Sequence, residues 1–427
     1  MLSFVRSFLK DSPNSIWMLS EQSIRLILNL IVSVVIARSY GPEEWGYYSF
    51  IISIQFLIIS IAKMGLDTVS IKEFSENKNN LKIALGTVFR IIMILSFIAF
   101  SILSLAVLLF EQNEIVQVGI LIICLSVFFA PIYTLDYFYQ SQKKAKISSV
   151  AKAFVILIST GLKIYFSIFS YDLNYIFLSF VIEYLLLSII LAISLLKTNA
   201  TLVNFFRYFD LKLAKNLLII ASPIIISIFF NFLLTRFDQF MIRYFLDFED
   251  LGIYSAALKI YESWMVFPII LSLSILPILT KERKSDFFKY KTLFVRFMRI
   301  GLWSCIAFAL IVSLLSEEII NLLFGEVYFD ASAVLSILVW ASIFSCMSTF
   351  SDRYFLIEKQ QGKILSRAII ATLLNIILNI LLIPELGING AAYATLIALI
   401  ISRFTIDFFD KDAKELFKFK LKALGIF

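Results

Sequence analysis

The chain has 427 residues, of which 60% are hydrophobic and only 16% are charged. Soluble proteins of this length have about 25% charged residues, so the composition excludes an ordinary cytoplasmic enzyme. A formal net charge of +7 would favour nucleic acid as a partner of a soluble protein. In this chain we expect most of the surface to face lipid instead.

The residue types present also exclude whole classes of chemistry. The chain has no histidine, which removes an imidazole base, a histidine-containing zinc site and a His-Asp relay. Cys124, Cys305 and Cys346 all lie in apolar runs and indicate neither a disulfide framework nor a thiolate metal site. Neither a GxxxxGK[ST] loop nor a GxGxxG turn occurs. We therefore predict no catalytic residues, no metal site and no cofactor.

Apolar stretches long enough to cross a bilayer recur along the whole chain, because about 20 apolar residues suffice for a membrane-spanning helix. The first stretch carries Glu21 and Arg25 and is not followed by a small-residue cleavage site, so we expect it to be retained. The predicted spans cover residues 15–40, 43–66, 82–110, 114–139, 148–170, 172–197, 215–245, 250–280, 292–316, 329–357, 363–384 and 387–410.

Lys and Arg residues gather in alternate connections, which orients the spans because cytoplasmic loops retain basic residues. On one side lie 30 of the 38 basic residues, including Arg6 and Lys10 before the first span, Lys63 in the second connection and Lys152 in the fourth connection. We therefore predict that both termini are cytoplasmic. Because these bases are spread over short segments beside anionic headgroups, membrane lipids and not nucleic acid are the expected partner.

Residues 411–424 read as a basic amphipathic helix in the cytoplasmic tail. Phe417, Leu421 and Leu424 fall on one stripe, and lysines fall on another. This pattern favours a membrane-surface anchor, and docking of a partner protein is the alternative.

A short internal repeat indicates a duplication. Residues 43–49 read EEWGYYS and residues 249–255 read EDLGIYS, and each segment follows the first span of its half. Two halves of six spans share one orientation, so a pseudo-twofold axis along the membrane normal relates them. We therefore predict an all-α membrane protein with an N-terminal lobe at 1–200, a cytoplasmic linker at 201–214, a C-terminal lobe at 215–410 and a tail at 411–427.

Three segments resemble a known family. Residues 38–48 (RSYGPEEWGYY), 251–260 (LGIYSAALKI) and 384–395 (PELGINGAAYAT) are similar to signatures of the polysaccharide biosynthesis, or Wzx-type O-antigen flippase, proteins. These proteins belong to the multidrug/oligosaccharidyl-lipid/polysaccharide (MOP) superfamily, which includes the MATE exporters. The resemblance covers nearly the whole chain in length, order and topology.

The resemblance implies a function, a location and partners. It implies a flippase in a bacterial cytoplasmic (inner) membrane that moves undecaprenyl-diphosphate-linked oligosaccharide, for O-antigen, capsular or similar polysaccharide, to the outer leaflet. Transport would proceed by alternating access through a cationic central cavity. Association with a polysaccharide polymerase and chain-length machinery is also implied.

Charged residues inside the predicted spans are candidate site residues, because a charge at mid-bilayer costs at least roughly 2.5 kcal/mol. We expect bases to bind the diphosphate, since Arg forks hold phosphate oxygens bidentately. The alternative is structural pairing, as the spacings of Glu21 with Arg25, Lys259 with Glu262 and Arg403 with Asp407 allow. The candidate cavity bases are Arg25, Arg236, Lys259, Lys163 and Arg90.

Acids in the spans admit a second role. Glu21, Glu183, Asp238 and Glu262 are candidates either for pairing with these bases or for coupling transport to a proton or sodium gradient.

The sequence leaves two other functions open. A cation-coupled MATE-type exporter of drugs or organic cations would share the fold. A membrane-embedded polysaccharide polymerase or glycosyltransferase is disfavoured, because such enzymes need a sizeable outer loop or a soluble catalytic face and no predicted loop exceeds about 20 residues.

Overall fold

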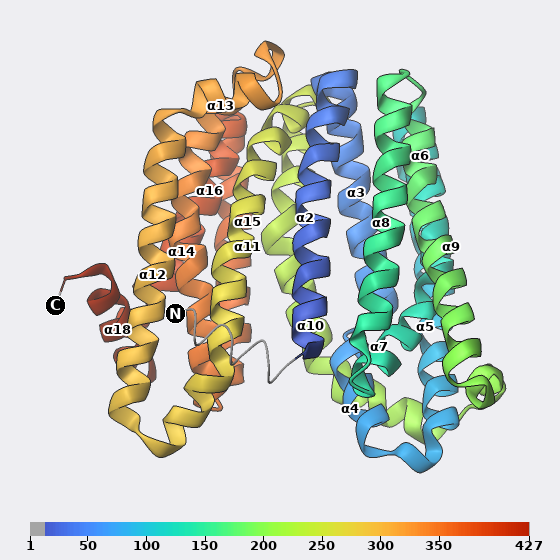
Figure 1. Ribbon diagram of the computed structural model, residues 1–427. Helices are drawn as coiled ribbons and strands as arrows, with labels where there is room; N and C mark the ends of the chain where they lie inside the picture. The colour runs from blue at the N-terminus through green and yellow to red at the C-terminus, as the bar shows by residue number, and fades with distance from the viewer. Residues whose placement is uncertain (1–12, 427) are drawn as a thin grey trace. The chain divides into compact units, whose positions relative to one another are not determined.

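The computed structural model describes residues 13–426, and every regular element within that range is helical (Figure 1). In the described part, 12 helical segments are long and apolar enough to cross a membrane. The predicted all-α fold with twelve spans is therefore confirmed. Residues 1–12, with Arg6 and Lys10 of the predicted cytoplasmic N-terminus, and Phe427 lie outside the described residues.

The chain forms two compact units. Unit 1 contains Tyr47–Ile228 and the described residues up to Tyr40, whereas unit 2 contains Gly41–Gly46 and the described residues from Phe229 onward. The division falls inside the long helix α10 (Leu211–Phe245), later than the linker expected at 201–214. It lies there because the first part of α10 packs on unit 1, where Ile224 lies against Gly65.

The described part of unit 1 contains six spans, of which the second begins with residues that belong to unit 2 (Gly41–Gly46), and two of the six are interrupted. The second span breaks at Met64 and Gly65, which have φ of 41° and 65°, and the fourth contains Pro131, which cannot donate a helical hydrogen bond. The elements are α2 (Pro13–Tyr40), α3 (Pro42–Lys63), α4 (Leu66–Glu76), η1 (Lys78–Asn80), α5 (Leu81–Phe110), α6 (Glu114–Cys124), η2 (Leu125–Ile132), α7 (Tyr133–Ser141), α8 (Ala145–Ile168), α9 (Leu173–Thr198), η3 (Ala200–Arg207) and the first part of α10.

Unit 2 continues from the second part of α10. Side chains of Asp247 and Asp286 cap the starts of its first two complete helices by accepting hydrogen bonds from backbone N–H groups. The further elements are α11 (Phe248–Ser285), α12 (Phe287–Leu314), α13 (Ser316–Leu323), η4 (Glu326–Tyr328), α14 (Ala331–Ile357), α15 (Gln361–Leu386), α16 (Ile388–Ile400), the π-helical turn η5 (Ile401–Thr405), α17 (Ile406–Phe409), η6 (Lys411–Ala413) and α18 (Lys414–Leu424).

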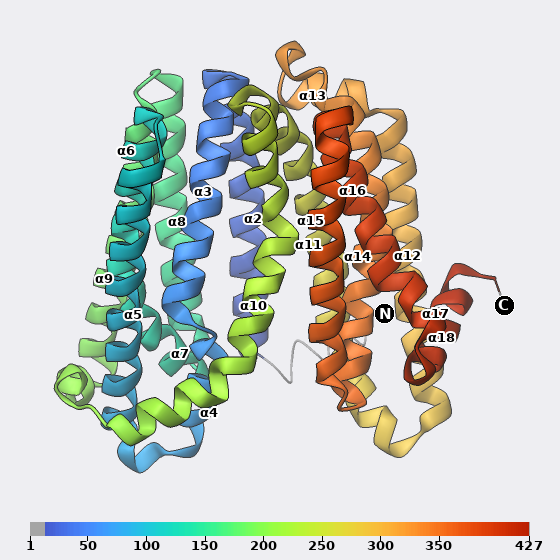
Figure 2. The same ribbon diagram turned by 180° about the vertical axis from the view of Figure 1, so that it is seen from behind.

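The C-terminal helix α18 docks on unit 2, beside α17 and α12 (Figure 2). Leu416, Phe419 and Ala423 are buried in a core cluster that includes Phe294 of α12 and Tyr354 of α14. The stripe assigned to the membrane from the sequence is therefore not the most buried face of this helix. The contact with the protein core has selected a different face, which also contains the completely buried Lys420.

Candidate functional site

Arg25 of α2 lies in a cluster of charged side chains within unit 1. Its Nε donates to Glu21 Oε1 at 2.9 Å, and its Nη1 donates to Glu183 Oε1 at 3.2 Å. The other oxygen of Glu183 accepts from Lys163 Nζ of α8 at 3.4 Å. The i,i+4 pair expected for Glu21 and Arg25 is thus present, and Glu183 joins bases from two helices. Arg25 keeps 34% of its side chain exposed but Lys163 only 4%, so Arg25 is the base that a ligand can reach.

A second group of charges surrounds Tyr133, at the start of α7. Lys152 of α8 forms an ion pair with Asp136, and Lys63 lies with its Nζ 3.4 Å from the centre of the Tyr133 ring. Among the described residues no carboxylate lies within ion-pair distance of Lys63, so the aromatic face and the more distant carboxylates of Asp136 and Asp67 balance its charge. From their place in the sequence, Lys63 and Lys152 are expected in cytoplasmic connections and not among the site residues.

Both groups meet at one small pocket. Arg25, Tyr133, Lys152 and Glu183 line it, and it encloses about 10 Å³, which is room for about one water molecule. Four bases and three acids in close contact make up the two groups, and Asp67 is a fourth, more distant acid that acts on Lys63. The members of the two groups are Arg25, Lys63, Lys152 and Lys163, with Glu21, Asp136 and Glu183.

The candidate bases of unit 2 have a different arrangement. Arg236 of α10 pairs through Nη2 with Glu262 Oε1 at 2.9 Å, and the two side chains are 24% and 28% exposed. Lys259, on the same helix as Glu262, has no carboxylate within ion-pair distance in the described part of the chain. The pairing of Lys259 with Glu262 expected from their spacing is therefore wrong, because the Arg236 guanidinium from α10 occupies that carboxylate.

Asp238 is buried in unit 2 among neutral polar groups, with 4% of its surface exposed. Its Oδ2 accepts from Tyr254 Oη at 2.8 Å and from Thr395 Oγ1 at 2.7 Å, and its Oδ1 accepts from Asn379 Nδ2 at 3.0 Å. Asn375 completes the cluster by donating to Thr395 Oγ1 at 3.2 Å. Within the described residues no base forms an ion pair with this carboxylate.

The Asp238 cluster can hold a proton or a small cation. A buried carboxylate with only neutral partners is costly as an ion, and hard cations take oxygen ligands. Besides the carboxylate, the buried Asn379 Oδ1 accepts no hydrogen bond in the described structure. No group of three or more His, Cys, Asp or Glu residues in the described chain is placed to hold a metal ion. Any bound cation would therefore rest on one carboxylate and neutral oxygens.

Arg90 lies apart from the Arg25 cluster. Its Nη2 donates to the backbone oxygens of Phe206 at 3.1 Å and Arg207 at 3.4 Å, so it holds η3 against α5. Gly86, one turn earlier on α5, allows this close approach, since a Cβ there would lie 2.1 Å from the Tyr208 backbone oxygen. Arg90 therefore fastens the segment that leads into α10.

The expected pair of Arg403 and Asp407 does not form. Asp407 instead pairs with Arg367 of α15 at 2.6 Å and with the buried Lys420 of α18. The cause is local, because the π-helical turn Ile401–Thr405 changes the spacing along the helix on which the i,i+4 expectation rests.

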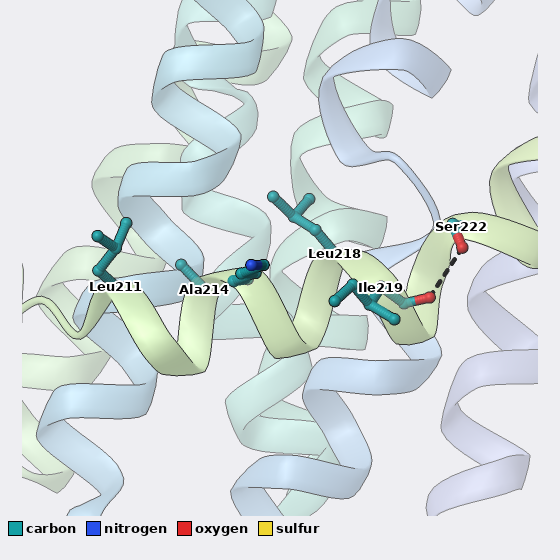
Figure 3. A pocket seen from close by; sticks show the side chains of 6 residues that line it. Leu211, Ala214, Leu218, Ile219 and Ser222 are labelled. Carbon is teal, nitrogen blue, oxygen red and sulfur yellow. Dashed lines mark hydrogen bonds between the residues drawn. The ribbon is translucent and has the colours of Figure 1, made fainter.

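A shallow apolar groove lies along the first part of α10, within unit 1 (Figure 3). Ser222 Oγ donates to the Ile219 backbone oxygen of the same helix at 2.8 Å, so the one hydroxyl in the groove is already used. The groove has the character of a surface for lipid chains. Its lining residues are Leu211, Ala214, Lys215, Leu218, Ile219 and Ser222.

Comparison with known families and named proteins gives concordant matches. Residues 13–282 match the family of polysaccharide biosynthesis proteins, and residues 223–381 match the MatE family. The capsular polysaccharide biosynthesis protein CapF of Staphylococcus aureus is 23% identical over 412 residues, 92% of this chain and 98% of CapF. The probable low-salt glycan biosynthesis flippase Agl15 of Haloferax volcanii is 24% identical over 192 residues, 45% of this chain and 41% of Agl15.

Two solved structures have a similar fold. The lipid II flippase MurJ, in an inward closed conformation, aligns with a TM-score of 0.75 at 17% identity, over 95% of this chain and 90% of that one. A multidrug resistance MATE transporter of the MOP superfamily, in an inward-facing conformation, aligns with a TM-score of 0.72 at 14% identity, over 94% and 95%. The chain therefore has the fold of MOP-superfamily transporters.

Proposed function

The chain belongs to the polysaccharide biosynthesis protein family, and from this premise we propose that it is a flippase and not an enzyme. It moves undecaprenyl-diphosphate-linked oligosaccharide repeat units, for O-antigen, capsular or a similar polysaccharide, from the cytoplasmic to the outer leaflet by alternating access. The names of CapF, Agl15 and MurJ support a lipid-linked glycan as the class of substrate.

The observation that carries the proposal is the group of four bases around Arg25, of which Arg25 itself is exposed enough for a ligand to reach. A base within a span must have a reason to stay there, because uncompensated charge is costly in hydrocarbon. Glu21 and Glu183 hold Arg25 in place, while Lys63 adds a base that no described carboxylate contacts within ion-pair distance. A diphosphate would add negative charge beside these bases.

The geometry around Arg25 suits transient binding. The guanidinium is held by two carboxylates, yet it keeps a third of its surface exposed and retains donors for phosphate oxygens. A diphosphate that binds these remaining donors would lie beside the carboxylates of Glu21 and Glu183. Repulsion between the anions weakens binding and so favours release after transport. The central cationic cavity expected from the sequence, with Arg236 and Lys259 contributing from unit 2, is part of the same proposal.

We place the coupling of transport to an ion gradient at Asp238. The other candidate acids, Glu21, Glu183 and Glu262, each contact a base, whereas Asp238 contacts only neutral donors. A proton or a sodium ion arriving at Asp238 would change the charge of a cluster that joins α10, α11, α15 and α16. Asp238→Asn should abolish stimulation of flipping by a proton or sodium gradient and leave flipping without a gradient.

The proposal is tested by measuring leaflet exchange in liposomes that contain the purified full-length protein. The probe is an undecaprenyl diphosphate oligosaccharide with a fluorophore that an added reductant quenches only in the outer leaflet. Wild type should accelerate exchange, and Arg25→Ala should slow it at least tenfold with an equal amount of folded protein. Lys72→Ala, at a side chain 74% exposed, should behave as wild type. Equal exchange with and without wild-type protein would rule the proposal out.

A MATE-type exporter of organic cations is the second candidate, because residues 223–381 match the MatE family. A pocket in unit 2 is lined by Asp238, Glu262 and Asp352, which is also compatible with a cationic solute. Efflux of ethidium from loaded liposomes distinguishes the two candidates. Gradient-driven ethidium transport without lipid exchange would favour the exporter.

The same proposal places the protein in a bacterial inner membrane with both termini in the cytoplasm. A polysaccharide polymerase and the chain-length machinery are proposed as partners, since they would consume the flipped repeat units. Accessibility of single cysteines, introduced into the tail and into the loop before α11, to a membrane-impermeant reagent in whole cells tests the orientation.

A further inference from the structure

A pocket of about 300 Å³ lies within unit 2, next to Asp238. This volume is at the lower end of the range for small-molecule sites, about 300–1,000 Å³. Its wall is mainly apolar but includes charged and hydroxyl side chains, of which α14 supplies Ser345, Ser348 and Thr349. We call it the unit 2 pocket.

Two charged side chains in the wall of this pocket, those of Asp352 and Arg403, make no hydrogen bond or close ion pair with described residues and balance each other only at longer range. The Arg403 guanidinium makes no hydrogen bond or ion pair with any described residue, although Arg403 is only 7% exposed. The Asp352 carboxylate likewise has no such partner in the described chain, and its Oδ1 is buried. Buried polar groups are nearly always hydrogen-bonded, so two unpartnered ones in one cavity indicate that something else binds there.

The local structure explains why Arg403 is available. Its neighbour on the helix, Asp407, is occupied by Arg367 and Lys420. The π-helical turn that contains Arg403 removes the regular i,i+4 spacing, and such turns occur frequently at functional sites. The backbone oxygen of Arg403 is also bound by Lys420, which fixes the position of the turn. The fold thus fixes the position of the buried Arg403 without giving its guanidinium a hydrogen-bond acceptor.

The chemistry of the wall favours a sugar over a diphosphate. The carboxylates of Asp238 and Asp352 would repel a diphosphate, whereas Glu262 is already paired with Arg236, and Arg403 is the one base among the residues that line the pocket. A sugar ring offers hydroxyl groups that both donate and accept. Carboxylates accept hydrogen bonds from the sugar hydroxyl groups, and a guanidinium donates hydrogen bonds to their oxygens.

We propose that the unit 2 pocket is a sugar-binding subsite, in which Asp352 and Arg403 hydrogen-bond hydroxyl groups of a sugar ring of the lipid-linked glycan. This inference rests on the proposed function, because it assigns the sugar to unit 2 and leaves the diphosphate to the cluster around Arg25. The diphosphate is then bound by the basic cluster around Arg25, and the sugar is bound by a pocket in which carboxylates outnumber bases.

The test is a binding measurement that does not depend on transport. Full-length protein in lipid nanodiscs is mixed with glucose, N-acetylglucosamine or glucuronate, and saturation-transfer NMR reports contact with each sugar. Binding of sugar-free undecaprenyl diphosphate is measured in parallel. The variants are Arg403→Met, which removes the guanidinium, and Ser348→Phe, which fills the pocket. Ala333→Phe, at an exposed position of the same helix α14, is the control.

At least one of the sugars should bind wild type and the control, and both pocket variants should weaken its binding at least fivefold. Binding of undecaprenyl diphosphate should be the same in all four proteins. The Arg403→Met protein should melt near the wild-type temperature, because no described group loses a hydrogen bond or close ion pair and Asp352 loses only a longer-range interaction. A lower melting temperature with sugar binding intact would assign Arg403 a structural role and overturn the inference.

Other results separate the two proposals. If none of the sugars binds wild type, or if ethidium binds and Ser348→Phe abolishes that binding, the sugar subsite is wrong. If Arg403→Met abolishes binding of undecaprenyl diphosphate, the pocket is a phosphate site and the inference also fails, whereas the flippase proposal stands. If wild type does not bind undecaprenyl diphosphate at all, the flippase proposal is the one that fails, and the sugar result is then judged by itself.

Discussion

Gly46 of α3 and Gly252 of α11 both belong to unit 2, and each lies against a backbone oxygen of the other's helix. A Cβ on Gly46 would lie 1.8 Å from the backbone oxygen of Phe248, and a Cβ on Gly252 would lie 1.8 Å from that of Pro42. Each oxygen belongs to the residue four positions before the opposite glycine. The two glycines, which the internal repeat places at equivalent positions, therefore have equivalent environments in the structure.

Replacing either glycine should destabilise the fold severely. An added methyl group cannot avoid a backbone oxygen as it could avoid a flexible side chain, so Gly46→Ala and Gly252→Ala should each cost about 3 kcal/mol or more. Thermal unfolding of detergent-purified protein and the yield of monodisperse protein measure the effect.

Gly161→Ala is the matched control, because nothing lies within 4 Å of a Cβ at that helical position. It should leave the melting temperature unchanged or raise it, since alanine favours the helix by up to about 1 kcal/mol. Equal melting temperatures of the Gly46→Ala, Gly252→Ala and Gly161→Ala proteins would show that the contact between the two glycines does not constrain the helices.

Glu183 should be more important for stability than an exposed acid. Glu183→Gln removes the carboxylate shared by Arg25 and Lys163, and leaving a buried base without its acid costs about 3–5 kcal/mol. Adding Lys163→Met to this variant should recover part of the loss, because the buried base is then removed as well. Differential scanning fluorimetry of the single and double variants measures both effects.

Glu76→Gln is the control for this comparison. The side chains of Glu76 and Lys72 are 62% and 74% exposed, and Glu76 Oε1 lies 4.0 Å from Lys72 Nζ. Loss of this ion pair should therefore cost less than about 1 kcal/mol. A Glu183→Gln protein that melts together with the Glu76→Gln protein would contradict the structural role given to Glu183.

The sequence predicts the spans well because the bilayer sets the length of each apolar run, whatever the helix packs against. It also predicts the pair of Glu21 and Arg25, since neighbours on one helix follow from helical spacing alone. The same rule fails for Lys259, because an arginine from another helix occupies Glu262. Which helices become neighbours depends on packing that spacing does not describe.

The surroundings of Asp238 were missed for a related reason. Its partners Asn379 and Thr395 are 141 and 157 residues away, and neither carries a charge that would draw attention in an apolar span. A signal was present, since Asn375 and Asn379 are four residues apart and so share one face of α15. Two amides on one face of an apolar helix require polar partners, and this pattern would have indicated a buried polar cluster.

Lys420 should hold the C-terminal helix on unit 2. Its completely buried Nζ donates to Asp407 and to the backbone oxygen of Arg403, so Lys420→Met removes one half of a buried ion pair. We expect a loss of about 3 kcal/mol, at the low end for such pairs because Asp407 keeps Arg367. Limited proteolysis should cut residues 411–424 faster than in wild type. Lys418→Met, at an exposed position of the same helix, should be cut at the wild-type rate.

The docking of this helix should also weaken in acid, through Asp410. Partial burial acts to raise the pKa of Asp410, but hydrogen bonds from Lys363 at 2.7 Å and Arg367 at 2.8 Å outweigh it and hold the pKa below its usual value. The folded state therefore binds fewer protons than the unfolded state, so the stabilisation is complete at neutral pH and is lost as the pH falls below about 4. Asp410→Asn should melt below wild type at pH 7, and the difference should shrink as the pH falls through this range. Melting temperatures of both proteins in the same detergent across a pH series measure it, and a difference that is constant from pH 7 to pH 3 would contradict the assignment.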